Sequence, residues 1–434
     1  MKPERFVGFD FGTTNSSLAV ADANGDVRIA TFRTGNHSDT EAYRSVLYFE
    51  PPTRGPGARR ARVLGGPSAI SQYLQAEPKG RLIQSIKSFA TSRSFAATAV
   101  FDRVYTFEEL VAILVKRIVA EAEETLGPLG KAVTVGRPVR FVGADTADDE
   151  AFAVGRLRSA LEMAGFQQID FEYEPIGAAY FYDEQLDHDE LVLIGDFGGG
   201  TSDFSLIRVG PSARKLHKRE ERILGNDGVG IAGDSFDASI IRRLVSPALG
   251  MGGEIRSGDK LLPVPTWVYL RLERWHHLSF LKDRDTLQML RSVKAQALEP
   301  DRIAALLHLI DQDLGYQLHR SVQTTKLRLS DAPASEFLFE DGDWRIQAEV
   351  PRREFEEWIE GHVQAIATCV DGLLSRCGVD GKGIDKVFLT GGSSFVPAVR
   401  RVFTDRFGAD KVAGGSEFTS VAKGLARRAK EAGG

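Results

Sequence analysis

Cysteine is scarce in this chain, which has only Cys369 and Cys377 among its 434 residues. A disulfide framework and a four-cysteine zinc site are therefore excluded, and the lack of cystines fits a reducing compartment. No stretch approaches the about 18 consecutive apolar residues of a membrane-spanning helix. The first residues show no apolar segment of the secretory type. These absences predict a cytoplasmic protein without a membrane partner.

An excess of positive charge is also missing. The chain has 55 lysines and arginines against 60 aspartates and glutamates, so its net charge is -5. Because nucleic-acid-binding proteins usually present a basic surface, we expect no nucleic-acid partner. Apolar residues make up 42% of the chain, which is typical of soluble globular domains. The length predicts more than one hydrophobic core.

The common nucleotide-binding signatures are absent or weak. No P-loop pattern occurs in the sequence. The segment 228–233 has the glycine spacing of a dinucleotide fingerprint, which requires a tight turn from a strand into a helix. A polar bend is expected just before it, at Asn226 and Asp227, and a helix only from about Ser235. We therefore expect no nicotinamide site there.

The sequence instead contains one hairpin pattern twice. In each copy, a strand of alternating apolar residues carries an aspartate near its end, and a turn of glycine and threonine leads into a second strand. The aspartates are Asp10 and Asp196. This pattern is typical of a β-hairpin. The predicted hairpins pair 6–11 with 17–21, and 191–197 with 203–209.

Further segments recur after the hairpins. A third strand is expected in each copy, at 27–32 and at 218–224. A strand followed by a turn and a helix also recurs, with strands at 133–135 and 387–389 and helices from about Asp145 and at 396–407. Duplication at this scale predicts two similar lobes whose related turns face one cleft.

Two stretches read as insertions into the duplicated pattern. The first covers about 40–110 and includes a loop rich in proline and glycine at 51–57. The second covers about 252–322, where apolar residues have the spacing of one helix face; they are Ile303, Leu306, Leu307 and Ile310. A helix at 355–374 is expected to contain Cys369, and both cysteines are predicted to be packing residues. A last helix is expected at 421–430.

The glycine and threonine turns have the chemistry of a phosphate site. Glycine lets backbone N–H groups approach a ligand closely, and successive N–H groups form a nest for an anion. The aspartates beside the turns suit Mg²⁺, directly or through its waters. Two such turns would hold a nucleotide's phosphates from both sides. The alternative interpretation is that each is an ordinary hairpin turn. A third glycine-rich turn at 391–393 makes this interpretation less favoured.

These motifs resemble the actin-like ATPase superfamily, and within it the nucleotide-binding domain of the 70-kDa heat-shock chaperones. Residues 9–16 resemble the family's first phosphate loop, 196–203 its second, and 389–397 its adenosine motif. Weaker matches are Ile86-Lys87, Pro138, Glu174-Pro175, 233–237 and 325–330. The resemblance covers the whole chain except roughly 245–315. The short length is similar to that of the YegD-like members, which consist of the ATPase domain only.

The resemblance implies an α/β protein with the actin-like ATPase fold, in which duplicated ribonuclease-H-like lobes surround a nucleotide cleft and carry two inserted subdomains. Lobe I would span 1–186, with its insert at about 40–110. Lobe II would span 187–434, with its insert at about 252–322, and no peptide-binding domain is expected. The implied function is that of a chaperone-like protein that binds ATP and hydrolyses it slowly. ATP or ADP and Mg²⁺ would be its cofactors, and a protein partner or client is expected.

The resemblance also implies a role for each matching residue. Hydrated Mg²⁺ would be held by Asp10, Asp196 and Asp203. The catalytic residues would be Lys87, which stabilises the γ-phosphate charge, with Glu174, Thr201 and Asp203 around the attacking water. The remaining nucleotide-binding residues would be Gly12, Thr13, Thr14, Asn15, Gly198, Gly199, Gly200, Gly233, Asp234, Gln323, Lys326, Leu327, Ser330, Gly391, Gly392, Ser393 and Phe395.

The chain departs from the family's pattern around the base. Leu327 and Phe395 stand where the family has two arginines flanking adenine, and Gln323 stands where it has a glutamate. An apolar clamp would still stack on a purine, but it offers no hydrogen bonds that distinguish adenine from guanine. We therefore expect relaxed selection between ATP and GTP. The family's interdomain arginine has no clear match, since Val154 falls near its place.

Two other functions remain open for a protein of this fold. One is an actin-like scaffold or filament that uses ATP only for assembly. The other, less favoured, is a sugar or acid kinase, which needs a general base beside an acceptor pocket. Asp203 could act as the base, but no second constellation for an acceptor is visible. Fold alone does not decide among these functions.

Overall fold

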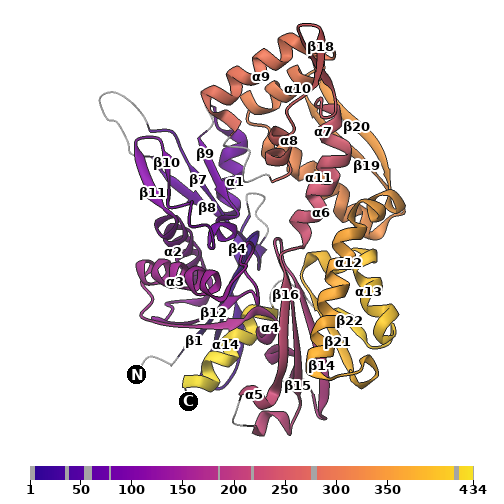
Figure 1. The fold of residues 1–434 in the computed structure, drawn as a ribbon. Helices are drawn as coiled ribbons and strands as arrows, with labels where there is room; N and C mark the ends of the chain where they lie inside the picture. The colour runs from indigo at the N-terminus through magenta and orange to yellow at the C-terminus, as the bar shows by residue number, and fades with distance from the viewer. Residues whose placement is uncertain are drawn as a thin grey trace. The chain divides into compact units, whose positions relative to one another are not determined.

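The computed structural model describes residues 5–34, 39–52, 61–77, 80–183, 186–216, 219–274, 281–414 and 420–433 (Figure 1). The chain divides into two compact units. The first comprises Met1–Ala232, Ala365–Ser394 and Arg400–Gly434, and the second comprises Gly233–Gln364 and Phe395–Val399. The boundaries of the two predicted lobes stay a prediction, since this division groups both duplicated sheets in the first unit.

The first sheet of this unit is built around the predicted N-terminal hairpin. Strand β1 (Phe6–Phe11) pairs antiparallel with β2 (Asn15–Ala21), which confirms that hairpin. On the far side of β2 lies β3 (Val27–Ile29), also antiparallel. On the other side of β1 lie two parallel strands, β12 (Ala132–Arg137) and β13 (Gln168–Tyr173). The order is β13-β12-β1-β2-β3, with β6 (Tyr43–Arg44) joined to β2.

The second sheet repeats this topology. Strands β14 (Glu190–Phe197) and β15 (Ser202–Val209) form the predicted second hairpin. Strand β16 (Ile223–Val229) pairs antiparallel outside β15, and β21 (Lys386–Thr390) and β22 (Val412–Gly414) follow β14 in parallel. The order β16-β15-β14-β21-β22 matches the first sheet strand for strand. The predicted duplication is therefore confirmed at the level of the sheets.

The third strands differ from their predicted positions. In the first copy, β3 ends at Ile29, and Phe32–Arg33 forms β4, which pairs separately with β5 (Asp39–Thr40). In the second copy, the strand predicted at 218–224 is wrong. Residue 218 lies outside the described residues, Arg219–Arg222 forms helix α5, and the strand runs from Ile223 to Val229.

The polar bend predicted at Asn226 and Asp227 is also wrong, because both residues lie within β16. Their side chains are satisfied by distant partners: Asn226 Oδ1 accepts a hydrogen bond of 2.6 Å from Ser205, and Asp227 pairs with Arg376. The glycine pattern at 228–233 thus does connect a strand to a helix, α6 (Gly233–Ile240). Since β16 is an antiparallel edge strand, it still lacks the parallel strand–helix–strand setting of a dinucleotide site.

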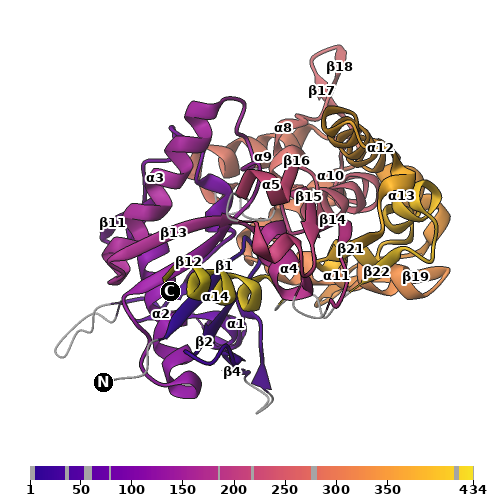
Figure 2. The ribbon, with the colours of Figure 1, turned by 90° about the horizontal axis from the view of Figure 1, so that it is seen from below.

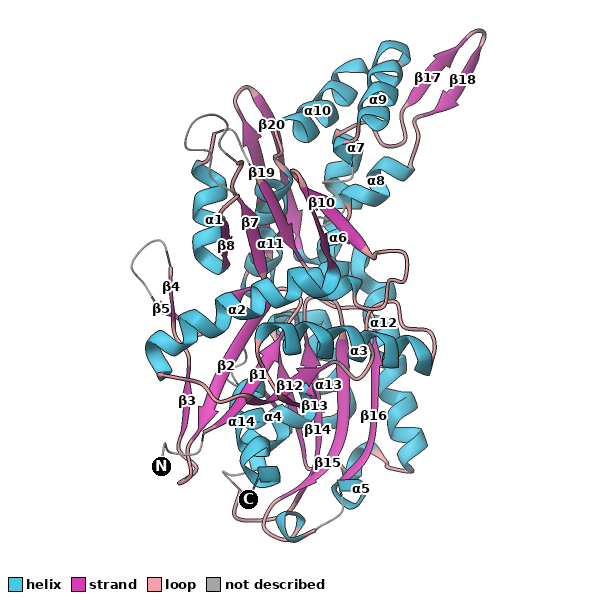
Figure 3. Ribbon diagram, turned by 90° about the vertical axis from the view of Figure 1, so that its left-hand side faces the viewer, coloured by secondary structure: helices cyan, strands magenta, loops and turns pink. Residues whose placement is uncertain are grey.

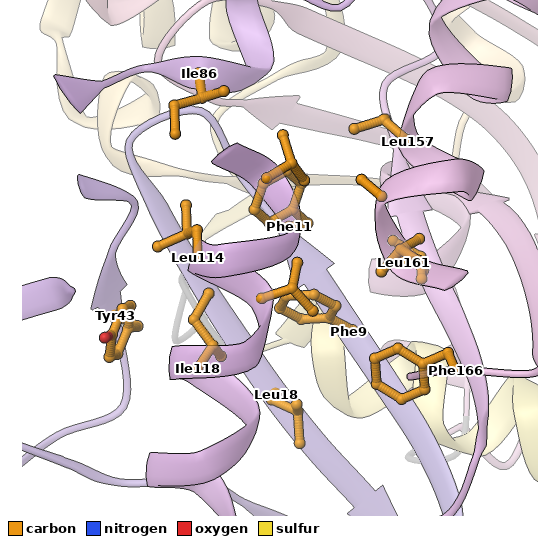
Figure 4. Packing of buried hydrophobic residues seen from close by; sticks show 14 of the residues in the cluster. Phe9, Phe11, Leu18, Tyr43, Ile86, Leu114, Ile118, Leu157, Leu161 and Phe166 are labelled. Carbon is orange, nitrogen blue, oxygen red and sulfur yellow. The ribbon is translucent and has the colours of Figure 1, made fainter. Parts of the chain in front are cut away.

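Two helices cover one face of the first sheet. They are α2 (Phe107–Leu126) and α3 (Ala147–Ala164), and each begins with a capping box in which a threonine and an acidic residue three positions on exchange hydrogen bonds. The start of α3 confirms the helix predicted from about Asp145. Figure 4 shows the buried side chains between these helices and the sheet; among them are Phe9, Phe11, Leu18, Leu114, Ile118, Leu157 and Leu161.

Helices α4 (Glu174–Asp183) and α14 (Ser420–Gly433) lie side by side, and α14 packs on β1, β2 and β12 (Figure 2). Helix α14 confirms the predicted final helix. Its approach is very close: a Cβ on Gly424 would lie 1.7 Å from the carbonyl oxygen of Gly177, and one on Gly8 would lie 2.2 Å from the amide nitrogen of Ala426. Glycine at these positions is what allows the backbones to touch.

The region of the first predicted insertion contains short strands around one helix. Strand β7 is flanked by β8 and β9, and β10 pairs with β11. In chain order the elements are β7 (Val46–Phe49), β8 (Val63–Gly65), α1 (Gly66–Gln75), β9 (Arg81–Gln84), the 3₁₀ turn η1 (Ile86–Phe89), β10 (Ala97–Val100) and β11 (Arg103–Thr106). The 3₁₀ turn carries one of the predicted catalytic residues, Lys87.

The second unit is mainly helical (Figure 3). The apolar stripe predicted at 303–310 lies on α10, and all four of its residues are buried. The elements after α6 are the π-helical turn Ile241–Val245, α7 (Ser246–Ala248), β17 (Glu254–Ser257), β18 (Lys260–Pro263), α8 (Trp267–Leu272), α9 (Arg284–Gln296), α10 (Pro300–Asp311), α11 (Gly315–Asp331), β19 (Ala334–Asp341) and β20 (Trp344–Pro351).

Helices α12 (Arg352–Cys377) and α13 (Pro397–Phe407) contain residues of both units. They confirm the helices predicted at 355–374 and 396–407.

Cys377 is the last residue of α12, and burial raises the pKa of the Cys369 thiol to about 12. Such a thiol stays protonated and unreactive, which agrees with the predicted packing role. Among the described residues, no helix has the length and apolar character needed to cross a bilayer.

A buried histidine makes the stability of the second unit depend on pH. Burial lowers the pKa of His319 to about 3, and Nε2 of its neutral ring donates to the Leu272 carbonyl at 3.4 Å. Below pH 6.5, the usual histidine value, the unfolded chain binds a proton that the folded chain does not. The contribution of neutral His319 to the free energy of unfolding is thus complete above pH 6.5. It decreases by up to about 1.4 kcal/mol for each unit by which the pH falls towards 3.

We therefore expect His319→Gln to reduce this acid sensitivity. Glutamine keeps an N–H donor but does not titrate, so the free energy of unfolding of the variant should fall less steeply than that of the wild type. Urea unfolding over a series of pH values measures the difference. Parallel curves for the two proteins would contradict the assignment.

Candidate functional site

The two predicted phosphate turns are both in the first unit and come close together. In the second turn, Gly198 N–H donates to the Thr201 carbonyl at 2.9 Å. In the first, a Cβ on Gly12 would lie 2.0 Å from the carbonyl oxygen of Asn15, so only glycine fits. A Cβ placed on Gly200 would lie 4.0 Å from Thr13 Oγ1. The turns predicted to face each other are therefore neighbours.

The third glycine-rich turn adjoins the second. Gly391 has a φ of 81°, and a Cβ there would lie 2.1 Å from the Phe197 carbonyl oxygen. Both the left-handed backbone and the close contact require glycine. Ser394 Oγ donates to the Gly391 carbonyl at 2.6 Å and closes the turn. The structure thus brings Gly391, Gly392 and Ser393 next to the end of β14.

Lys87 and Glu174 form a buried ion pair. Lys87 lies in the 3₁₀ turn after β9, and Glu174 is the first residue of α4. Lys87 Nζ is 2.6 Å from Glu174 Oε1, and the two side chains are only 6% and 10% exposed. A buried pair of this kind needs close geometry, because the attraction between the two charges must offset the cost of taking them out of water. This contact joins two residues that the sequence predicted for the same site.

Asp203 is held by the loop that follows β12. Its Oδ1 accepts backbone hydrogen bonds from Val139 at 2.7 Å and Arg140 at 3.1 Å, directly after Pro138. Its Oδ2 is buried without a hydrogen-bond partner in the described structure. Burial, and then the negative charge of Glu174, raise the pKa of Asp203 well above its usual range. An unpartnered buried carboxylate oxygen is a free acceptor for a bound molecule.

Asp10 and Asp196 belong to the same electrostatic cluster. Asp196 is paired directly across the hairpin with Asp203, and in an antiparallel pair such residues share one face. Burial raises the pKa of Asp10 and Asp196, the latter to about 6, and the nearby Glu174 raises both further. Lys87 lowers both. The cluster therefore has four carboxylates against one lysine, which favours a bound cation.

One residue near this cluster was not among those predicted. Thr390, at the end of β21, donates through Oγ1 to Asp196 Oδ1 at 2.5 Å. The pairing of β14 with β21 sets Asp196 opposite Thr390. Thr390 lies within the sequence motif at 389–397, immediately before Gly391. Its hydrogen bond to Asp196 could not be predicted from that motif, because it depends on the parallel pairing of two strands that are distant in sequence.

The carboxylates do not form a direct metal centre. Among the described residues, no three histidine, cysteine, aspartate or glutamate side chains are placed to ligate one ion. Mg²⁺ usually keeps several of its waters and is bound through one or two carboxylates. The excess of buried negative charge thus fits a hydrated ion held by Asp10, Asp196 and Asp203 through water, as the resemblance implies.

The second unit contains the remaining predicted residues. Lys326 of α11 donates to the Gly233 carbonyl at 3.0 Å and pairs with the buried Asp237 at 2.7 Å. It thereby ties α11 to the start of α6, where Asp234 also lies. Leu327 is 63% exposed and Phe395 42% exposed. The adenosine contacts predicted for Gln323, Lys326, Leu327, Ser330 and Phe395 stay predictions.

Comparisons with known proteins agree with the motifs. The chain matches the family described as Hsp70 protein over residues 6–248 and 310–431, and the interruption falls where no resemblance was seen. It is 25% identical over 430 residues to the chaperone protein DnaK of Thermosipho africanus (strain TCF52B). The alignment covers 99% of this chain but only 59% of that relative. Because the matched residues make up most of the chain, this protein belongs to the Hsp70 family of chaperone-type nucleotide-binding proteins, with the actin-like ATPase fold.

Proposed function

We propose that this chain is an ATP-binding, slowly ATP-hydrolysing module of a cytoplasmic chaperone-like protein that acts with a protein partner or client. One observation carries the proposal: the cluster of Lys87, Glu174 and three aspartates lies in the same unit as the three adjoining glycine-rich turns. Family membership favours this function over the filament and the kinase.

Each residue has a distinct task in this proposal. The backbone N–H groups of the turns, with Thr13, Thr14 and Thr201, bind the phosphates, and Thr14 Oγ1 is buried without a hydrogen-bond partner in the described structure. Lys87 stabilises the charge that develops on the transferred phosphoryl group. Bound Mg²⁺ would neutralise the phosphate oxygens. Leu327 and Phe395 clamp the base with little selection between ATP and GTP.

The attacking water is ordered by acidic side chains. Asp203 Oδ2 is free to accept its proton, and a base works best when its pKa lies near the working pH. Burial and the negative charge of Glu174 raise the pKa of Asp203 above its usual range. Glu174 is fixed by Lys87 and completes the water network. Phosphoryl transfer needs mainly positioning and electrostatic stabilisation, which this set of residues provides.

The test compares ATP binding and phosphate release in the wild type and Asp203→Asn. We expect calorimetry to show one Mg²⁺-dependent ATP site in both proteins, because the turns are intact. Phosphate release should fall about 100-fold or more in the variant, because a general base contributes about 10²- to 10⁴-fold. Asp259→Asn, at an exposed turn between β17 and β18, is the matched control. A wild type that binds no ATP would refute the proposal.

A further inference from the structure

The segment that carries Lys87 has little regular structure of its own. The 3₁₀ turn is four residues long, and it begins after Ser85, whose φ of 51° is unusual for a residue with a side chain. The chain then passes through successive turns, in which Ala90 N–H donates to the Lys87 carbonyl at 3.0 Å and Ser92 N–H donates to the Phe89 carbonyl at 3.1 Å. Its position must therefore be set by contacts with neighbouring elements.

Arg156 of α3 supplies three of these contacts. Its side chain is buried, and its guanidinium donates to three backbone carbonyls that follow Lys87. Nη1 donates to Phe89 at 3.3 Å and to Ser92 at 3.1 Å, and Nη2 donates to Phe95 at 3.1 Å. A planar group with five donors can hold several carbonyls in one fixed arrangement, which a lysine cannot do.

The guanidinium is itself fixed from the other side. Arg156 Nε donates to Glu108 Oε1 at 2.6 Å, in the first turn of α2, and the guanidinium carbon lies 4.1 Å from the centre of the Phe107 ring. One side chain thus connects α2, α3 and the segment 89–95. An exposed pair, Arg93 with Asp148, also reaches this segment, but exposed pairs contribute little.

We propose that Arg156 is a positioning residue for Lys87, acting through the backbone of segment 89–95. Phe89 is two residues from Lys87 and belongs to the same 3₁₀ turn, so a shift of its carbonyl moves the backbone that aims Lys87 Nζ. This inference rests on the proposed function, in which Lys87 contacts the γ-phosphate. Arg156 itself touches no substrate.

The test is Arg156→Lys, which keeps the positive charge and loses the planar donors. A displacement of about 1 Å can cost on the order of 100-fold in rate, so we expect kcat for ATP hydrolysis to fall by about 10- to 100-fold. The Kd for ATP should change by less than about threefold, because the glycine turns are untouched. Hydrogen exchange of the amides at 86–92 should become faster. Arg93→Ala, on the same segment, is the matched control and should change none of these.

A double-variant cycle separates positioning from general damage. In the Lys87→Ala background, Arg156→Lys should have no further effect on hydrolysis, since residues that act as a unit are not additive. An equal loss in both backgrounds, or wild-type kcat in Arg156→Lys, would overturn the proposal. If Arg156→Lys does not fold, Glu108→Gln weakens the same anchor and should lower kcat in the same direction. Full hydrolysis by Lys87→Ala would instead refute the proposed role of Lys87.

Discussion

Lys87→Ala should lower the rate of ATP hydrolysis by about 100-fold or more, because it removes the cation aimed at the developing phosphoryl charge. Most of the ATP affinity should remain, since the glycine turns still hold the phosphates. The loss of Lys87 also leaves Glu174 buried without its partner at 2.6 Å. Single-turnover phosphate release measures the rate, and calorimetry measures the affinity.

The electrostatic and folding effects of this change can be separated. Removing one partner of a buried pair destabilises a protein strongly, whereas removing both is often tolerated. Lys87→Ala with Glu174→Gln should therefore recover part of the thermal stability lost in the single variant, but not its hydrolysis. Lys294→Ala, at an exposed position of α9, is the control. Wild-type hydrolysis in Lys87→Ala would remove this residue from the catalytic set.

Gly424→Ala should destabilise the first unit by about 3 kcal/mol or more. Helix propensity alone predicts the opposite, since alanine is favoured over glycine by about 1 kcal/mol in a helix. The steric effect is larger here, because the new Cβ would lie 1.7 Å from the backbone oxygen of Gly177 and neither helix can yield by a rotamer change. Denaturant unfolding measures the difference in free energy.

The matched control for this prediction is Gly155→Ala in α3. A Cβ on Gly155 meets no atom within 4 Å, so helix propensity decides and the variant should be as stable as the wild type or more stable, by up to about 1 kcal/mol. Equal effects of the two substitutions would show that α14 does not pack on α4 as described.

The central hairpins were predictable because their pattern is local. Alternating apolar residues and a glycine turn occur within residues 6–21 in the first copy and 191–209 in the second, and β1–β2 and β14–β15 follow that pattern. Strand β16 was misplaced because its polar residues look like a bend. Asn226 and Asp227 have distant partners in the strand, Ser205 and Arg376, and local sequence does not show those contacts.

The candidate site was predictable in its residues but not in its contacts. The motifs named Lys87 and Glu174, yet their ion pair joins positions 87 residues apart. The contacts of Thr390 with Asp196, and of Arg156 with the segment after Lys87, depend equally on strands and helices meeting across the fold. Side-chain periodicity reports which face of an element is buried, but not which distant partner meets it.

The packing of α14 on β1 has a consequence for the order in which the protein can fold during translation. Strand β1 is made first, but the helix that contacts it begins at Ser420. At about 5–20 residues per second, the ribosome needs on the order of tens of seconds to make the intervening chain. Until then, the small apolar residues of β2 that meet this helix, Ala19 and Ala21, remain uncovered. Contacts of such high sequence separation form slowly, so the N-terminal sheet should reach its native packing only after α14 has been synthesised.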